Sequence, residues 1–175
     1  VVRTPDDWNL LRHSRIPVLL TGTSDWTPGQ PILAAINALD PSHHDLNIKI
    51  LQRAVTMAKA CHGMLHIISA YPSLEPWLSP IRDAVDADTI RAEIESDTRA
   101  QLERAVASAS VTEHISHILP GRPAAVVESV RAELGGGLLV IGSRARSGVE
   151  AAILGNTAET LLHQIDTDVL VIPND

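Results

Sequence analysis

The stretch LLVIGSRARSGVEAAILGNTAETLLHQIDTDVLVI, residues 138–172, decides the fold. It begins and ends with a short apolar run, LLVI at 138–141 and VLVI at 169–172, and each run is typical of a buried strand. Between them lie a loop with three glycines and an amphipathic helix predicted over 156–165. A strand, a helix and a second apolar strand form the unit from which parallel α/β sheets are built.

The same alternation of strands and helices extends back through the chain. We predict further strands at 31–37, 64–70 and 112–119, and further helices at 46–61, 88–108 and 123–134. Strands that are almost continuously apolar indicate a parallel sheet covered by helices on both faces. With right-handed crossovers, this order gives a doubly wound, Rossmann-like α/β fold.

The first thirty residues do not fit this order. The segment LLRHSRIPVLL at 10–20 resembles LLHQIDTDVLV at 161–171, and both follow a helix-to-strand pattern. We therefore predict that residues 1–22 are the final helix and strand of a preceding, similar domain, that 23–30 form a linker, and that 31–175 are the domain itself.

The last strand is expected to have a partner. We predict that Val169–Ile172 pairs with Ile16–Leu20, either within one chain or across a dimer. An unpaired apolar strand edge promotes association, so a stable protein needs that edge covered.

Composition excludes several classes of function. The net charge is −7 and no basic run is present, so we expect no nucleic-acid binding. No apolar run has the length of a membrane span, and we expect no membrane association. Cys61 is the only cysteine, which excludes a disulfide framework and favours a cytoplasmic location.

The loop after the fourth strand carries the candidate binding chemistry. In doubly wound sheets, ligands bind beyond the carboxyl ends of the strands, where the strand order reverses. The first and fourth strands flank that point, and they end near Asn37 and Gly142. Gly142 would let the backbone leave the strand sharply and approach a ligand closely. Arg144 could contact phosphates through two hydrogen bonds.

The helix after this loop is a candidate anion site. Asn156 is expected to cap the helix, and Glu159 would complete a capping box. The backbone N–H groups of Asn156, Thr157 and Ala158 would then be free to bind an anion at the positive end of the helix dipole.

Residues 141–159 resemble the nucleotide-binding loop of the universal stress proteins. In that loop a glycine, two residues, a second glycine and nine further residues precede Gly-Ser or Gly-Thr. Gly142 and Gly155 match the first and third glycines, whereas Ala145 stands at the second and Asn156 at the Ser or Thr.

Three other stretches indicate which subgroup of the family the chain resembles. The second domain of the E-type tandem universal stress proteins is the part of the family that the chain resembles most. The stretches that carry this resemblance are the sequence of residues 148–159, the opening TPDDWNLLR and the segment SAYP at 69–72. The resemblance implies a five-stranded parallel sheet of order 3-2-1-4-5 and pairing of last strands between two universal stress domains. It also implies a role in stress tolerance rather than a defined metabolic reaction.

Two departures from the family pattern predict weakened nucleotide binding. Nucleotide-binding members end the first strand with an Asp that holds the ribose or a metal ion, and Asn37 lacks that charge. The methyl group of Ala145 would crowd the space for the phosphates. The strand backbone that meets adenine in the family maps to Ile67. The candidate binding residues are Ala35, Asn37, Ile67, Gly142, Ser143, Arg144, Ala145, Gly155, Asn156, Thr157 and Ala158.

These observations favour a non-enzymatic domain that binds or senses a small ligand through a degenerate nucleotide loop. ATP, AMP or another small anionic or amphipathic molecule is the candidate ligand, and no catalytic residue is assigned. Two alternatives stay open. One is a true ATP-binding domain with at most weak ATPase activity, and the other is a dimerisation or interaction module with a vestigial pocket.

A Pro-rich loop follows the second strand. Its apolar residues either hold the loop against the domain or form a lid over the pocket; they are Leu74, Trp77, Leu78 and Ile81. His114 and His117 lie three residues apart on a strand, so they point to opposite faces and cannot share a metal ion. His66 is expected to be a satisfied core or edge histidine. We predict no metal site.

Overall fold

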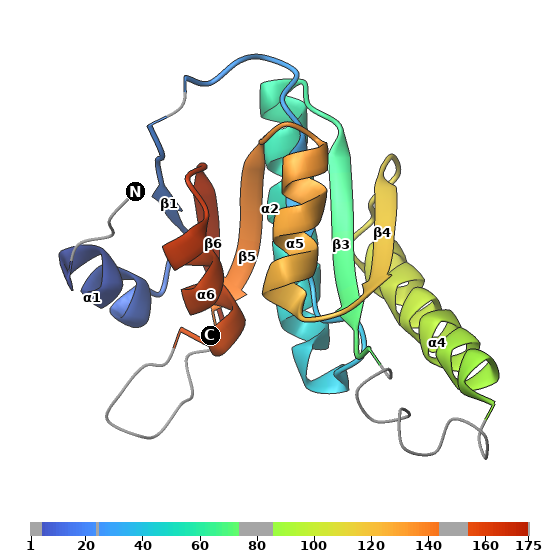
Figure 1. The fold of residues 1–175 in the computed structure, drawn as a ribbon. Coiled ribbons are helices and arrows are strands. Elements are labelled where there is room, and N and C mark those ends of the chain that lie inside the picture. Colours follow the sequence, from blue (N-terminus) through green and yellow to red (C-terminus); the bar gives the residue numbers. More distant parts are fainter. Residues whose placement is uncertain (1–4, 24, 74–85, 144–153, 175) are drawn as a thin grey trace.

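The computed structural model of the chain describes residues 5–23, 25–73, 86–143 and 154–174. These residues form one six-stranded sheet, in the order β1-β6-β5-β2-β3-β4, with helices on both faces (Figure 1). The strands are β1 Val18–Leu20, β2 Ile32–Ala35, β3 Leu65–Tyr71, β4 Ile115–Pro120, β5 Leu138–Ser143 and β6 Val169–Pro173. The helices are α1 Pro5–His13, the 3-10 helix η1 Pro41–His43, α2 His44–Cys61, α4 Ala87–Ser108, α5 Pro123–Glu133 and α6 Asn156–Gln164.

Five of the strands form the parallel sheet that was predicted. β2 lies in the centre, paired with β3 on one side and β5 on the other, while β4 and β6 extend the two flanks. Numbered along the chain, these five strands lie in the order 3-2-1-4-5, which confirms the doubly wound fold. The predicted total of five strands was too small, because β1 joins the sheet as a sixth.

β1 pairs antiparallel with β6, and Leu19 lies opposite Leu170. The predicted pairing of Ile16–Leu20 with Val169–Ile172 is therefore confirmed within this chain for Val18–Leu20 and Val169–Val171. Ile16 itself precedes the strand and is 71% exposed. β1 covers the edge of β6 that would otherwise present unpaired backbone groups.

Side-chain packing also anchors the N-terminal segment. Leu11 of α1 is buried in the core that α5 and α6 form on one face of the sheet. The Trp8 ring lies 4.8 Å from the ring of His163 in α6, measured between centroids. Arg12 and Glu159 form an ion pair at 3.8 Å between α1 and α6. α1 and β1 thus pack against the domain that follows them, and the prediction that they end a preceding domain stays a prediction.

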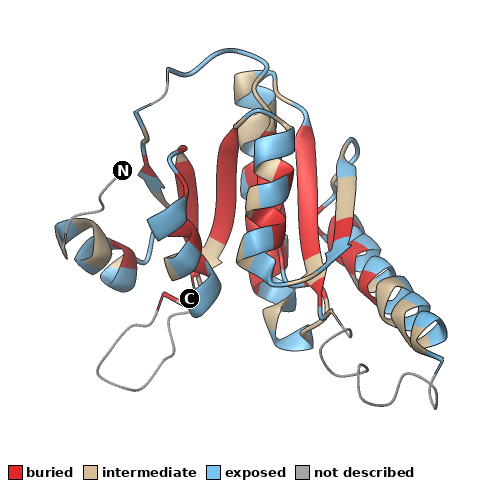
Figure 2. Cartoon of the chain, viewed as in Figure 1, coloured by how far each residue is buried: buried red, intermediate tan, exposed pale blue. Residues whose placement is uncertain are grey.

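Alternate strand residues enter two cores, one on each face of the sheet. In β5, Leu138 and Val140 pack with residues of α2 and α4, whereas Leu139 and Ile141 pack with residues of α5 and α6. The central strands are accordingly buried along almost their whole length (Figure 2). This is the pattern of a sheet covered on both faces, and it explains why the strands are apolar without alternation.

The start of α6 differs from the prediction. Gly155, not Asn156, occupies the N-cap position, with φ +97° and no side-chain capping bond. The Glu159 N–H donates to the Gly155 carbonyl at 2.9 Å, so Asn156 is already the first residue of the helix. The predicted capping box is therefore wrong. A positive φ is accessible to glycine at little steric cost, which places the cap one residue earlier.

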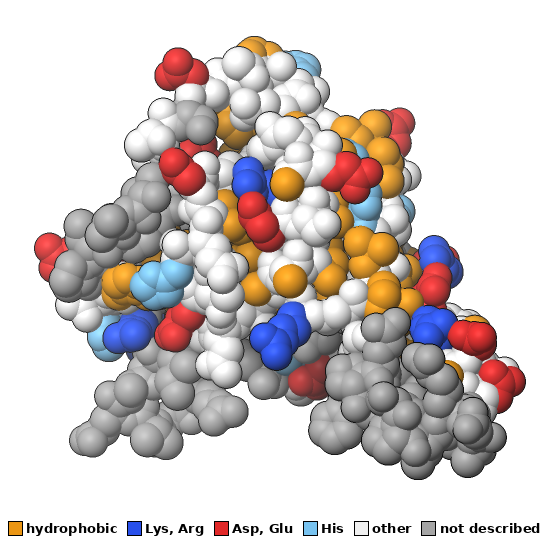
Figure 3. All heavy atoms as spheres, in the orientation of Figure 1, with side chains coloured by type: hydrophobic (Ala, Val, Ile, Leu, Met, Phe, Trp, Pro, Cys, Tyr) orange, Lys and Arg blue, Asp and Glu red, His pale blue; other side chains and the backbone are white. Residues whose placement is uncertain are grey.

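The surface on the α5 side carries acidic and basic side chains interspersed with one another (Figure 3). Hydrophobic and histidine side chains reach the surface beside α5, where β3 and β4 lie in Figure 1. β4 is an edge strand, and its Ile115 and Leu119 are 45% and 39% exposed. Within the described ranges, no helix combines the length and apolarity needed to cross a membrane.

Candidate functional site

A pocket of about 560 Å³ lies at the carboxyl ends of β2 and β5. Because β2 pairs with β3 on one side and β5 on the other, this is the point where the strand order reverses. The described residues that line the pocket are Ala35, Ile36, Asn37, His43, Leu46, Asn47, Ile50, Ile68, Ala70, Pro123, Val127, Ile141, Gly142, Leu154, Gly155, Asn156, Thr157, Ala158 and Leu161.

The structure brings most of the predicted binding residues together around this pocket. Seven of the eleven line it, namely Ala35, Asn37, Gly142, Gly155, Asn156, Thr157 and Ala158. Ser143 is buried at the end of β5 and is not part of the lining. Ile67 packs into the core, while Ile68 and Ala70 of the same strand line the pocket. The remaining predicted residues lie outside the described ranges: Arg144 and Ala145, and the lid candidates Leu74, Trp77, Leu78 and Ile81.

Gly142 is not the point at which the backbone leaves the strand, so that part of the prediction is wrong. It is the fifth residue of β5 and pairs with Ile172, so the backbone is still in the strand at this point. A Cβ atom at Gly142 would lie 2.7 Å from Cδ2 of Leu46 and 3.0 Å from Cδ1 of Ile50. The glycine therefore lets the first two turns of α2 pack against the end of β5. That close packing positions the wall of the pocket.

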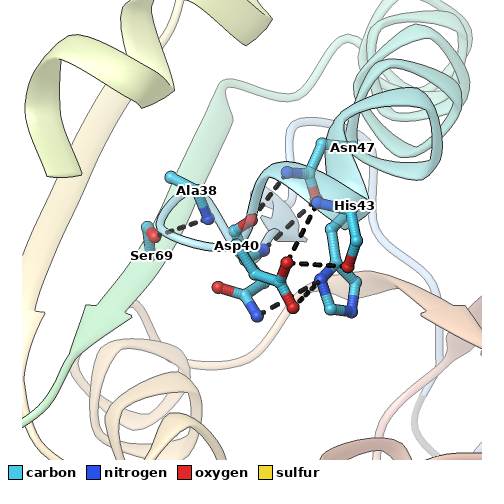
Figure 4. Close-up of polar contacts among 7 residues, drawn as sticks. Ala38, Asp40, His43, Asn47 and Ser69 are labelled. Carbon is cyan, nitrogen blue, oxygen red and sulfur yellow. Dashed lines mark hydrogen bonds and ion pairs between the residues drawn. The ribbon is translucent and has the colours of Figure 1, made fainter.

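The chain after β2 is held by side chains from neighbouring elements (Figure 4). Asn47, buried in α2, clamps the backbone of Asn37: its Nδ2 donates to the Asn37 carbonyl at 2.8 Å, and its Oδ1 accepts from the Asn37 N–H at 3.2 Å. The Ser69 hydroxyl of β3 accepts from the Ala38 N–H at 3.3 Å. These bonds fix the path of the chain where it leaves the sheet beside the pocket.

A second polar group follows in η1. Asp40 caps this short helix, because its Oδ1 accepts from the Ser42 N–H at 2.9 Å and from the Ser42 hydroxyl at 2.7 Å. The other carboxylate oxygen lies 3.0 Å from Nδ1 of His43. His43 and Asn47 both line the pocket, and neither was predicted to do so. The signal that could have identified them is the polar run DPSHHDLN at 40–47, which directly follows the first strand.

The N-terminus of α6 faces the same pocket. Asn156, Thr157 and Ala158 are the first three helical residues, and their N–H groups have no acceptor among the described residues. The first N–H groups of a helix lie beyond the reach of its own carbonyls, and the helix dipole makes this end positive. The arrangement can therefore bind an anion without a basic side chain.

The histidines of β3 and β4 form a contact that sequence reasoning missed. Nδ1 of His66 lies 2.9 Å from Nε2 of His117, and the rings are stacked with centroids 5.2 Å apart. His66 is buried, as expected of a satisfied core or edge histidine. Burial, and then the neighbouring His117, lowers the pKa of His66. No group of three or more metal-ligating side chains is found in the part of the chain that the structure describes.

The fold and the pocket define a Rossmann-like domain of the kind in which ligands bind at a strand-order switch point. The universal stress protein family matches residues 30–173, most of the chain. The chain therefore belongs to the universal stress protein family, which confirms the resemblance carried by residues 141–159.

Similar relatives include tandem members of this family. Universal stress protein E of Escherichia coli K12 is 31% identical over 183 residues, a match that covers 100% of this chain and 56% of the relative. The solved structure of PA1789 from Pseudomonas aeruginosa PAO1, described as functionally unknown, is 34% identical with a TM-score of 0.75; it covers 98% of this chain and 57% of that one. The chain thus spans about half the length of the relatives it matches.

Two universal stress proteins with the same fold have been solved with nucleotides. One is in complex with cAMP, at 19% identity, with a TM-score of 0.55 and coverage of 85% of this chain and 100% of that one. The other, from Archaeoglobus fulgidus, is in complex with dAMP, at 18% identity, with a TM-score of 0.52 and coverage of 83% and 99%. At these identities the likeness shows the fold alone.

Proposed function

We propose that this universal stress domain binds a small phosphorylated ligand, with an adenine nucleotide as the first candidate, and that it contributes to stress tolerance by binding rather than by turnover. One observation carries the proposal. Seven residues predicted from the sequence pattern line a single pocket, and three of them form the N-terminus of α6.

The pocket has the two kinds of surface that a nucleotide needs. Its volume of about 560 Å³ lies within the range of small-molecule sites. Leu46, Ile50 and Val127 give it an apolar wall, which suits a base or another flat apolar group. The N-terminus of α6 and the amides of Asn37 and Asn47 supply the polar groups. The cAMP and dAMP complexes of proteins with this fold support the same ligand class.

A requirement for Mg²⁺ is not part of the proposal. Magnesium is usually held by one or two carboxylates together with the phosphates. Among the described lining residues no side chain is a carboxylate, and Asn37 stands where nucleotide-binding relatives are expected to carry an Asp. We expect Mg²⁺ to add little to the affinity for ATP, and we expect at most weak hydrolysis.

A carboxylate introduced at the start of α6 tests the proposal. Thr157 is exposed at the pocket, whereas Thr160, also exposed, lies one turn further along and does not line it. Thr157→Glu should weaken binding of AMP by about tenfold or more, because like charges are brought together. Thr160→Glu serves as the matched control and should bind normally. Isothermal titration calorimetry on both variants measures the difference, and equal affinities would argue against an anion site at α6.

Pairing with another universal stress domain is a second proposal, carried by the N-terminal segment. Leu10, Ile16 and Leu19 expose apolar side chains on α1, in the turn after it and on β1. The relatives have about twice the length of this chain, so a further domain is the natural cover for these side chains. Ile16→Asp should weaken any dimer of this chain in sedimentation equilibrium, and a dimer of unchanged stability would exclude this surface.

A further inference from the structure

His43 differs from the other described residues of the pocket because its side chain can ionise. Nineteen described residues line it, and the other eighteen are apolar, amide, hydroxyl or glycine residues. His43 alone among them has an ionisable side chain. Histidine is the side chain whose charge ordinarily changes between pH 5 and 8. The charge that the described wall of this pocket presents to a ligand is therefore set by one imidazole.

Local structure fixes this imidazole in place. η1 is held by the hydrogen bonds from Ser42 to Oδ1 of Asp40, and Oδ2 of Asp40 lies 3.0 Å from Nδ1 of His43 (Figure 4). The side chain of His43 is 16% exposed, against 41% for Asp40. Nδ1 also lies 3.5 Å from Nδ2 of Asn37. Nε2 of His43 has no partner among the described residues, so it is available to a ligand.

The charged groups near His43 lie at the N-terminus of η1 and at the start of α2. Among the described residues, the carboxylate of Asp40 contacts His43, and His44 and Asp45 follow in the first turn of α2. The described pocket residues on β2, β3, β5, α5 and α6 carry no ionisable side chain. A change of charge at His43 is therefore not offset by another ionisable group in the described lining.

We propose that His43, positioned by Asp40, is the cationic group of the described pocket lining and that it selects phosphorylated ligands over their unphosphorylated counterparts. The inference rests on the proposed function and adds how the charge of the ligand is neutralised. An imidazolium takes the place of a divalent cation: Nδ1–H donates to Asp40 and Nε2–H donates to a phosphate oxygen. Hydrogen bonds between charged groups are about twice as strong as neutral ones, so the protonated form binds phosphate more tightly.

The test compares two probes that differ only in the phosphate. Cyclic AMP carries a phosphodiester that stays ionised between pH 5.5 and 8, and adenosine is uncharged there. With EDTA present, cAMP should bind wild-type protein about tenfold more tightly at pH 5.5 than at pH 8, and adenosine should bind equally at both. His43→Gln should bind cAMP with an affinity that no longer depends on pH. His44→Gln, at the exposed neighbour, should behave as wild type.

A lysine at position 43 shows whether the positive charge, rather than the shape of the imidazole, is what binds the phosphate. His43→Lys should bind cAMP at pH 8 at least as tightly as wild type does at pH 5.5, because its charge persists across the range. Circular dichroism at each pH establishes that the variants are folded. If wild type binds neither cAMP nor adenosine, the proposed function fails and the inference fails with it. If wild type binds both but the preference for cAMP survives in His43→Gln, the inference alone is wrong.

Discussion

The imidazoles of His66 and His117 stack across two neighbouring parallel strands, with a ring nitrogen of one 2.9 Å from a ring nitrogen of the other. The two residues are not opposite each other in the ladder, since His66 lies opposite Ile115 and His117 opposite Ile68. The contact is diagonal across the β3–β4 pair. One hydrogen fits between the two facing nitrogens, so one of them donates and the other accepts.

This pair predicts a loss of stability in acid. The pKa of His66 is lowered in the folded state, by burial and then by His117, from an unfolded value of about 6.5. Below pH 6.5 the unfolded chain binds more protons than the folded one at this site, so the free energy of unfolding falls as the pH falls. Above that pH the site has no effect. Urea unfolding at pH 7.5 and pH 5.5 measures the loss.

The matched variants are His66→Gln and His44→Gln. The first should lose less stability than wild type between the two pH values, because the lowered pKa is gone. The second removes an exposed histidine and should show the full loss. An identical pH dependence in wild type and His66→Gln would place the acid sensitivity elsewhere.

Gly142→Ala should destabilise the domain and deform the pocket. The added Cβ would lie 2.7 Å from Cδ2 and 2.9 Å from Cγ of Leu46, so α2 or β5 has to shift. Such overpacking typically costs about 1–3 kcal/mol. Leu46→Ala should remove the clash, and the double variant should therefore be more stable than the sum of the two single changes predicts. A double-mutant cycle in urea tests this, and strict additivity would contradict it.

Asn47→Leu should loosen the chain that follows β2. The change removes both hydrogen bonds to the Asn37 backbone, and unpaired polar groups cost about 1–3 kcal/mol when water cannot replace the lost partner. The control is Gln52→Leu on the exposed side of α2, which should change stability by less than about 0.5 kcal/mol. Thermal unfolding distinguishes the two. Equal melting temperatures would mean that the clamp contributes little.

Removal of residues 1–22 should make the domain associate. Without β1, the edge of β6 presents unpaired backbone groups, and the core cluster on the α5 and α6 side of the sheet loses Leu11 and Leu20. Sedimentation velocity at matched concentrations should show larger species for the shortened chain than for residues 1–175. A shortened chain that stays monomeric would show that β6 does not need its antiparallel partner.

The parallel sheet could be predicted from sequence because most of its strands are short runs dominated by apolar residues. The run VLVI at 169–172 falls within β6, and the strands expected at 31–37 and 64–70 contain or overlap β2 and β3. A pocket lies at the predicted switch point, because that point depends only on the order of the strands. Seven predicted residues accordingly line one pocket.

Features that depend on register or on dihedral angles could not be predicted in this way. The contact between His66 and His117 requires the alignment of β3 with β4, which no local pattern encodes. The cap at Gly155 depends on its φ of +97°, so the more favourable capping side chain of Asn156 was a misleading signal. The place of His43 in the pocket depends on how η1 packs beside α2, which the polar run at 40–47 does not specify.

Because of β1, the residues that match the family and the residues that form the sheet are not the same set. The family match begins at residue 30, yet the sheet begins at Val18 and its first strand is hydrogen-bonded to its last. A protease that cuts between residues 23 and 30 would therefore break the chain without releasing the piece before the cut. The nicked protein would migrate as two bands on a denaturing gel and as one particle in solution.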